Sequence, residues 1–188
     1  ITAACTGRCK HCSQGDHKSS DNIDKYSASN AVREIAYEYS IDSVMTFGGE
    51  PLLFPETVYE IHKAAKEMNI PKRQLITNGY FGKDSEKIKL VADMLAESGV
   101  NEILLSVDAF HQETIPLEYV MEFAEAVIKN DMNIKVHPAW LVSKDNDNGY
   151  NQTTKALLAE FDQMGIVTGE GNVIFPAGNA LKYFGEYF

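Results

Sequence analysis

The sequence contains few cysteines, no long apolar run and no dense basic cluster. Only three of its 188 residues are cysteine, and the formal net charge is −10. No apolar stretch approaches the roughly 18–20 residues that cross a bilayer, and no signal-peptide pattern is present. The sequence also lacks the clustered Lys and Arg residues expected of a nucleic-acid binder. These absences predict a cytoplasmic protein that binds neither a membrane nor nucleic acid.

The three cysteines all lie in the first dozen residues. An odd, tightly clustered set argues against a secreted disulfide scaffold and favours metal binding or redox chemistry in a reducing compartment. The apolar and charged fractions, 44% and 23%, are those of an ordinary folded protein. The chain opens on Ile1 and closes on Phe188 without an obvious stop. We therefore expect residues 1–188 to be one core domain from a longer protein that has further N-terminal residues and a C-terminal extension.

Short aliphatic runs alternate with segments of helical periodicity. The predicted strands are Ile1–Ala4, Ser43–Phe47, Gln74–Thr77, Glu102–Val107, Ile134–Val142 and Ile166–Phe175. The apolar stripes between them are expected to face the core. These stripes are Val32, Ile35, Ala36 and Tyr39; Val58, Ile61, Ala65 and Met68; Ile88, Val91 and Leu95; Val120, Phe123, Val127 and Ile128; and Leu157, Phe161 and Met164. The alternation predicts an α/β fold with a parallel sheet, either an open doubly wound sheet or a partial (βα)6 TIM-type barrel with helices outside.

Both folds gather ligands at the carboxyl ends of the strands, so chemical motifs are expected just after strands. Two polar stretches interrupt the pattern. Residues 13–25 are expected to form a long mobile loop. Residues 143–149 are rich in Asp and Asn, but Ala156 stands where a calcium loop starting at Asp145 needs a Glu. This second stretch is therefore interpreted as a solvated turn.

Cys5, Cys9 and Cys12 place three thiols on one loop after the first predicted strand. Thiolates select zinc, copper or iron–sulfur clusters. A closed zinc site needs a fourth ligand, for which His11 is badly placed beside Cys12, while His17 is available. A four-iron cluster on three thiols instead leaves one iron open to a small molecule. The spacing favours the cluster.

The pattern Cys-x3-Cys-x2-Cys with His11 before the third Cys resembles the signature of the radical S-adenosylmethionine (radical SAM) enzymes. The resemblance extends to Gly48-Gly49-Glu50-Pro51, which is similar to the family's GGEP motif and follows the second predicted strand. It implies a partial barrel, a [4Fe–4S] cluster on the cysteines and S-adenosylmethionine on the open iron. The GGEP-like turn is then expected to hold the amino group of the cofactor.

Two further strand ends carry small polar residues, Thr77-Asn78 and Ser106-Val107-Asp108. Ser106 and Asp108 are two apart in an extended segment, so their side chains share one face. The resemblance implies that these strand ends contact the ribose and carboxylate of the cofactor. His111 and His137 are weaker candidates for touching cofactor or substrate.

The resemblance implies a radical enzyme that cleaves S-adenosylmethionine reductively. The resulting 5′-deoxyadenosyl radical takes hydrogen from a peptide or small-molecule substrate, and a flavodoxin- or ferredoxin-type donor supplies the electron. Phe175-Pro176-Ala177-Gly178-Asn179-Ala180 faintly resembles a segment of peptide-modifying (SPASM/twitch-like) members, which often carry Gly-Arg-Ala there. Two alternatives use the same thiols, a non-catalytic zinc-binding module and an iron–sulfur electron carrier. The acidic charge disfavours a nucleic-acid substrate.

Overall fold

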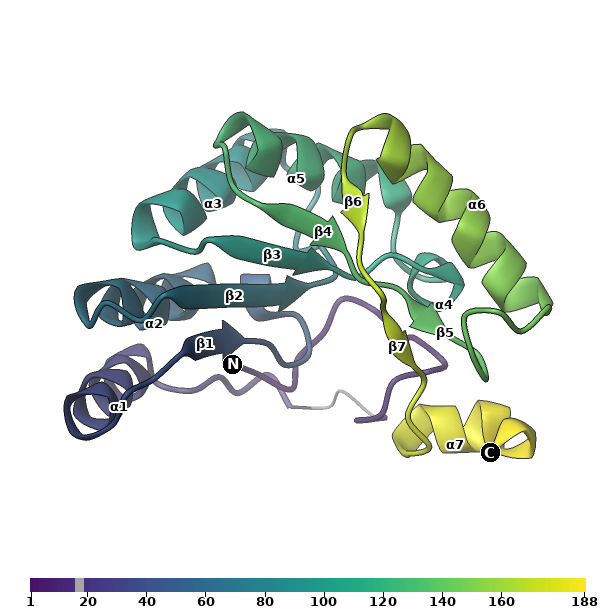
Figure 1. The fold of residues 1–188 in the computed structure, drawn as a ribbon, viewed down its shortest axis with the longest axis horizontal. Helices are drawn as coiled ribbons and strands as arrows, with labels where there is room; N and C mark the ends of the chain where they lie inside the picture. The colour runs from purple at the N-terminus through teal and green to yellow at the C-terminus, as the bar shows by residue number, and fades with distance from the viewer. Residues whose placement is uncertain (16–18) are drawn as a thin grey trace.

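A computed structural model describes residues 1–15 and 19–188. Its main sheet has five parallel strands in the order β1-β2-β3-β4-β6 (Figure 1). A second, two-stranded parallel sheet pairs β5 with β7. The strands are β1 (Ser43–Thr46), β2 (Lys72–Thr77), β3 (Glu102–Leu105), β4 (Ile134–Val136), β5 (Ala139–Trp140), β6 (Val167–Thr168) and β7 (Asn172–Val173).

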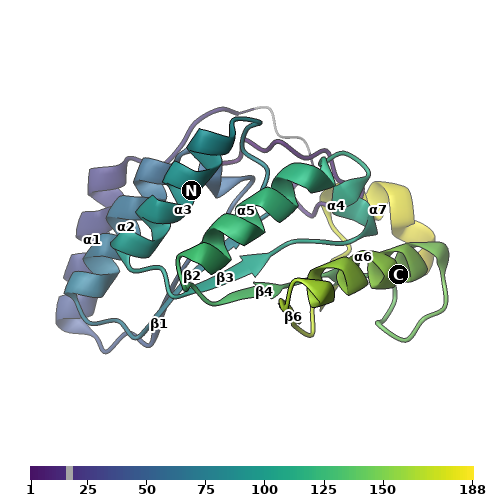
Figure 2. The same ribbon diagram turned by 90° about the horizontal axis from the view of Figure 1, so that it is seen from above.

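The larger helices lie side by side over the outer face of the sheet, as expected for a parallel sheet built from strand–helix units (Figure 2). These helices are α1 (Lys25–Glu38), α2 (Pro55–Glu67), α3 (Ser85–Ser98), α5 (Leu117–Lys129) and α6 (Gly149–Gln163). The shorter elements are η1 (Pro51–Leu53), α4 (Ala109–Gln112), α7 (Gly178–Phe184) and η2 (Gly185–Tyr187). The arrangement confirms the predicted α/β fold and its partial barrel. Among the described helices, none is long and apolar enough to cross a membrane.

Local signals in the sequence set the helix ends. The Asp84 carboxylate accepts hydrogen bonds from the first turn of α3, and Gly99, with φ of 88°, ends that helix in a left-handed conformation. Leu75 and Ile103 point from the strands into a core that Phe123 of α5 also enters, and all three side chains are fully buried. The opposite face of the strands points into the half-open barrel, where Lys135 bonds Glu102 at 2.6 Å.

The prediction that Ile1–Ala4 forms a strand is wrong. Only Thr2 makes an isolated bridge, to Asn22, and the segment is otherwise held by single hydrogen bonds to residues 21 and 23 and to the turn after β1. The predicted strands at 134–142 and 166–175 are each split in two. Pro138, which has no N–H to donate, interrupts the first, and the glycines at 169 and 171 accompany the break in the second.

The predicted core-facing stripe of α1 is also wrong. Ile35 is 51% exposed and Tyr39 69% exposed, while the buried residues of the helix are Ala28 and Ser29. The helix lies beyond the edge strand β1 and packs on α2, so much of its apolar surface stays uncovered. The stripes of α2, α3 and α5 are buried, apart from Met68, which is half-buried just after α2, and Ile128 at the end of α5, which is 39% exposed.

The Asp- and Asn-rich turn is organised by Asn151, whose fully buried amide bonds the backbone at Leu141, Ser143 and Asn146. This network confirms an ordinary turn. The predicted loop at 13–25 ends where α1 begins at Lys25, and residues 16–18, which include the candidate zinc ligand His17, lie outside the described residues.

Candidate functional site

A cavity of about 360 Å³ opens at the carboxyl ends of the strands. It brings together segments far apart in the sequence: the N-terminal loop, the turn after β1, the ends of β2 and β3, and the β5–β7 pair. All predicted site residues line it except Glu50 and Pro51. Those that do are Cys5, Cys9, His11, Cys12, Gly48, Gly49, Thr77, Asn78, Ser106 and Asp108.

The three cysteine side chains line this one cavity, and no disulfide joins them. Burial and, to a smaller extent, the nearby Asp108 carboxylate raise the pKa of the Cys9 thiol to about 12. Burial also raises the pKa of Cys5. The sulfurs lie near enough that a negative charge on one disfavours ionisation of its neighbour. A cationic centre is therefore needed to hold them as thiolates. This donor set fits an iron–sulfur cluster on three thiols.

Polar contacts hold the cysteine loop in place. The backbone N–H of Gly7 lies 3.4 Å from the Cys5 sulfur, and the Asn78 amide nitrogen lies 3.6 Å from it. At the other end of the loop, the Asn179 backbone N–H donates to the Cys12 carbonyl at 2.9 Å, and its side chain donates to the Cys9 carbonyl at 3.3 Å. Asn179 thus joins the start of α7 to the loop. Sequence reasoning gave it no role beyond its departure from Gly-Arg-Ala.

His11 packs within the protein beside the cavity. Its ring centroid lies 4.9 Å from that of Phe110 and 4.6 Å from that of His111. Burial lowers its pKa to about 4, and its Nδ1 has no hydrogen-bond partner among the described residues. His11 is therefore neutral at pH 7, and its predicted contact with the cofactor stays a prediction.

The Gly48-Gly49 turn needs glycine because residues 1–4 press against it. A Cβ on Gly49 would overlap the Ala4 carbonyl, and one on Gly48 would meet the Thr2 carbonyl at 2.5 Å. Gly49 and Glu50 each donate a backbone hydrogen bond to this segment, at 2.7 and 2.8 Å. The two glycines thereby position the loop that carries the cysteines, besides lining the cavity.

Glu50 is fully buried, and its carboxylate makes hydrogen bonds within the protein. Its carboxylate accepts hydrogen bonds from the Thr77 hydroxyl at 2.7 Å, from the Asn78 backbone at 2.8 Å and from Leu52 N–H at 2.9 Å. Burial raises its pKa to about 7, although these three bonds act in the opposite direction. Glu50 ties the glycine turn to the end of β2, and Pro51 is buried at the first position of η1. A contact of either residue with the cofactor stays a prediction.

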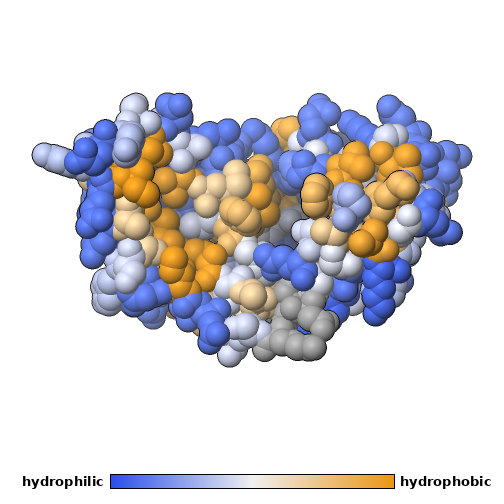
Figure 3. All heavy atoms as spheres, turned by 90° about the horizontal axis from the view of Figure 1, so that it is seen from below, coloured by the Kyte–Doolittle hydropathy of each residue, from blue (hydrophilic) through white to orange (hydrophobic). Residues whose placement is uncertain are grey.

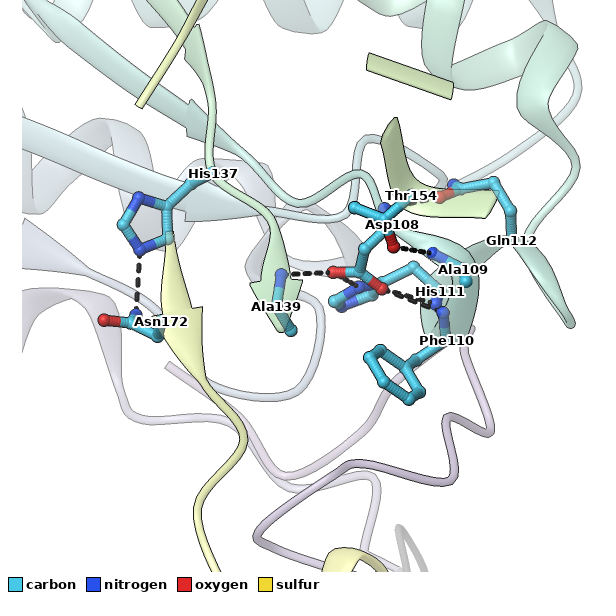
Figure 4. A network of polar contacts seen from close by, with 9 residues as sticks. All are labelled: Asp108, Ala109, Phe110, His111, Gln112, His137, Ala139, Thr154 and Asn172. Atoms are coloured by element: carbon cyan, nitrogen blue, oxygen red, sulfur yellow. Dashed lines mark hydrogen bonds and ion pairs between the residues drawn. The ribbon is translucent and has the colours of Figure 1, made fainter. Parts of the chain in front are cut away.

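Ser106 and Asp108 both line the cavity, but they differ in environment. Ser106 is partly exposed, whereas Asp108 is fully buried and each of its oxygens accepts two hydrogen bonds. The donors are the backbone N–H groups of Phe110, His111 and Ala139 and the Nδ1 of His111 (Figure 4). Burial alone would raise the pKa of Asp108, but the charge and hydrogen bonds of His111 outweigh it and hold that pKa well below its ordinary value.

Sequence reasoning missed the side of the cavity formed by β5 and β7. Asn172, Val173 and Phe175 line it together with His137. Only His137 was a candidate, because a lone Asn after Gly171 carries no motif. The strand break at Pro138 was the one available signal.

Comparison with known proteins agrees with this geometry. No curated protein matches the chain. Among solved structures, "Native anSMEcpe with bound AdoMet" has a TM-score of 0.66 at 19% identity, covering 93% of this chain and 50% of that one. "Native anSMEcpe with bound AdoMet and Cp18Cys peptide" has a TM-score of 0.63 at 19% identity, covering 91% and 48%. The chain thus spans about half the length of these structures, and at this identity the likeness shows the fold.

The sequence profile of the Radical SAM superfamily matches residues 1–172, which include the cysteine loop, the glycine turn and the strand ends that line the cavity. The chain therefore belongs to the Radical SAM superfamily, whose members use a [4Fe–4S] cluster and S-adenosylmethionine.

Proposed function

We propose that this chain is the catalytic core of a radical SAM enzyme acting on a peptide or small molecule. Cys5, Cys9 and Cys12 hold the cluster, and S-adenosylmethionine lies in the same cavity against Gly48–Gly49 and the ends of β2 and β3. The observation that carries the proposal is the convergence of three buried or half-buried thiols with these strand ends on one cavity.

Bound together, the cluster and S-adenosylmethionine supply a one-electron cleavage that yields a 5′-deoxyadenosyl radical able to take hydrogen from a substrate. The chain's own residues supply binding and orientation. Gly7 and Asn78 offer N–H groups to the Cys5 sulfur, and such contacts tune a thiolate ligand. The Glu50 carboxylate keeps Thr77 and Asn78 in register with the glycine turn.

An external one-electron donor of the flavodoxin or ferredoxin type completes the proposed reaction. We place the enzyme in the cytoplasm, because thiols that must stay reduced suit a reducing compartment. The solved relative with a bound peptide supports a peptide-modifying member, and the chain would then be the core domain of a longer protein.

The experiment is anaerobic reconstitution with iron and sulfide, followed by reduction and addition of S-adenosylmethionine. The expected result is a brown protein that forms 5′-deoxyadenosine, measured by liquid chromatography. Cys12→Ala should abolish this product. Lys10→Ala is the control, because Lys10 lies in the same loop but its side chain pairs with the exposed carboxylate of Glu113, at 3.0 Å.

Two outcomes would contradict the proposal. A colourless protein with stoichiometric zinc would favour the metal-binding module. A brown protein that forms no 5′-deoxyadenosine above the Cys12→Ala background would favour an electron carrier.

A further inference from the structure

Two neighbouring strand paths on one side of the cavity, β4–β5 and β6–β7, are interrupted at positions that lie beside each other. β4 ends at Val136 and β5 resumes at Ala139, while β6 ends at Thr168 and β7 resumes at Asn172. The broken segments stay joined, because Gly169 N–H donates to the Val136 carbonyl at 2.8 Å and Asn172 N–H donates to the Pro138 carbonyl at 2.9 Å. Paired interruptions of this kind re-aim side chains at the edge of a site.

The two side chains aimed by this break are His137 and Asn172. The His137 Nε2 and the Asn172 amide nitrogen lie 2.8 Å apart. Burial lowers the pKa of His137, so the ring is neutral at pH 7. An amide nitrogen is a donor, so Nε2 accepts and the ring proton lies on Nδ1. The pair is left with two donors, His137 Nδ1–H and the second Asn172 amide N–H, and one acceptor, the Asn172 carbonyl oxygen, and none of them has a partner among the described residues.

Exposed apolar side chains surround the pair within the same cavity. Phe47 is 58% exposed, Val173 51% and Phe175 69%. Side chains of this size that line a cavity without joining the core offer apolar surface to a ligand. Figure 3 shows the corresponding face of the molecule, where apolar groups flank a hollow.

The pair is also separate from the buried polar network at Asp108. Figure 4 shows His137 and Asn172 on the far side of Ala139 from Asp108 and His111. Asp108 is saturated with hydrogen bonds from the protein, whereas the pair at the strand break keeps unused hydrogen-bonding capacity.

We propose that His137 and Asn172 form a substrate subsite that binds one secondary amide group of a peptide. The Nδ1–H of His137 donates to the amide carbonyl, and the Asn172 carbonyl accepts the amide N–H. An apolar side chain of the same substrate packs against Phe47 and Phe175. This inference rests on the proposed function and narrows its substrate class to peptides.

The test measures binding of a defined probe to the reconstituted full-length protein with S-adenosylmethionine present. The probe is N-acetyl-L-phenylalanine N-methylamide, and the comparison compound has ester oxygens in place of both N–H groups. Equilibrium dialysis should show the amide bound about tenfold more tightly, which corresponds to one hydrogen bond of about 1.4 kcal/mol. Asn172→Leu should remove most of this preference, and His137→Leu should weaken the binding of both compounds, because both have the carbonyl to which Nδ1–H donates.

Asn133→Leu is the matched control, because Asn133 is exposed beside β4 and its side chain makes no hydrogen bond among the described residues. It should keep the preference. Circular dichroism checks that each variant is folded. His137 lies between β4 and β5 and Asn172 lies in β7, so one variant can fail to fold without ending the test.

Two results would overturn the proposal. An unchanged preference in folded Asn172→Leu, together with unchanged affinity for both compounds in folded His137→Leu, would remove the pair from substrate binding. A parallel loss of affinity for S-adenosylmethionine would assign the pair to the cofactor. Absence of 5′-deoxyadenosine from the reconstituted wild type without substrate would reject the proposed function separately.

Discussion

Replacing Asp108 with Asn changes one oxygen of a fully buried carboxylate to an amino group. The oxygen that accepts from Ala139 N–H at 2.9 Å and from His111 Nδ1 at 2.8 Å would become a donor facing donors. His111 can respond by changing tautomer, but the Ala139 backbone N–H cannot. One buried donor is therefore left unpaired, and the hydrogen bonds to the other oxygen no longer have a charged acceptor.

An unsatisfied buried donor costs about 1–3 kcal/mol, and a hydrogen bond to a charged group is about 1 kcal/mol stronger than a neutral one. Removing a buried charge offsets part of this loss. We expect Asp108→Asn to lower the free energy of unfolding by about 2–4 kcal/mol at pH 7. The amide hydrogen of Ala139 should exchange faster by one to two orders of magnitude.

The pH dependence of the folding stability is a second measurement that tests the effect of Asp108→Asn. The native pKa of Asp108 lies below its ordinary 3.8, so the unfolded chain binds the proton first as the pH falls. The stability from this group is present above about pH 4 and is lost below it, and Asp108→Asn should remove that part of the acid dependence.

Guanidinium unfolding followed by circular dichroism measures the change. Asp84→Asn is the control, since Asp84 is an exposed helix cap and Asn caps nearly as well. A loss below about 0.5 kcal/mol at Asp108, with Ala139 still protected from exchange, would refute the reasoning.

Three more changes test other parts of the structure. Gly49→Ala should prevent cluster assembly, measured as iron content after reconstitution, because its Cβ would overlap the N-terminal segment; Gly82→Ala, with open space around its Cβ, should not. His62→Leu should remove about 3 kcal/mol of the stability that is lost as the pH falls from 7 to 4, because burial lowers the folded pKa of His62 to about 4 from 6.5. An equal slope in both proteins would contradict this. Asn179→Ala should speed loss of iron to a chelator severalfold without changing the helix content, and an unchanged rate would show that its bonds to the cysteine loop are dispensable.

The fold was predictable where a local pattern coincides with packing. The strands at 43–46, 72–77 and 102–105 follow aliphatic runs, and their buried side chains meet the stripes of α2, α3 and α5. The stripe of α1 looked the same in sequence, but burial also depends on what covers a helix, and no pattern within α1 reports that. The split at Pro138 was visible as a missing N–H, while the matching split at 169–171 depends on pairing with another strand.

The site was predictable as a set of residues and less so as a set of roles. Spacing placed the cysteines, Gly48–Gly49 and Asn78 on one cavity. It could not show that the carboxylates of Glu50 and Asp108 are satisfied by protein donors, because those donors are mainly backbone N–H groups positioned by the fold. Asn172 and Asn179 were missed for a related reason, since each acts through a contact with a distant segment.

The most direct measurement is electron paramagnetic resonance of the reconstituted, reduced protein with and without S-adenosylmethionine labelled with nitrogen-15 in its amino group. Our account predicts about four irons per chain, a reduced-cluster signal whose shape changes on addition of the cofactor, and coupling of that nitrogen to the cluster. A cluster signal that the cofactor leaves unchanged, or a protein that takes up no cluster on Cys5, Cys9 and Cys12, would contradict it.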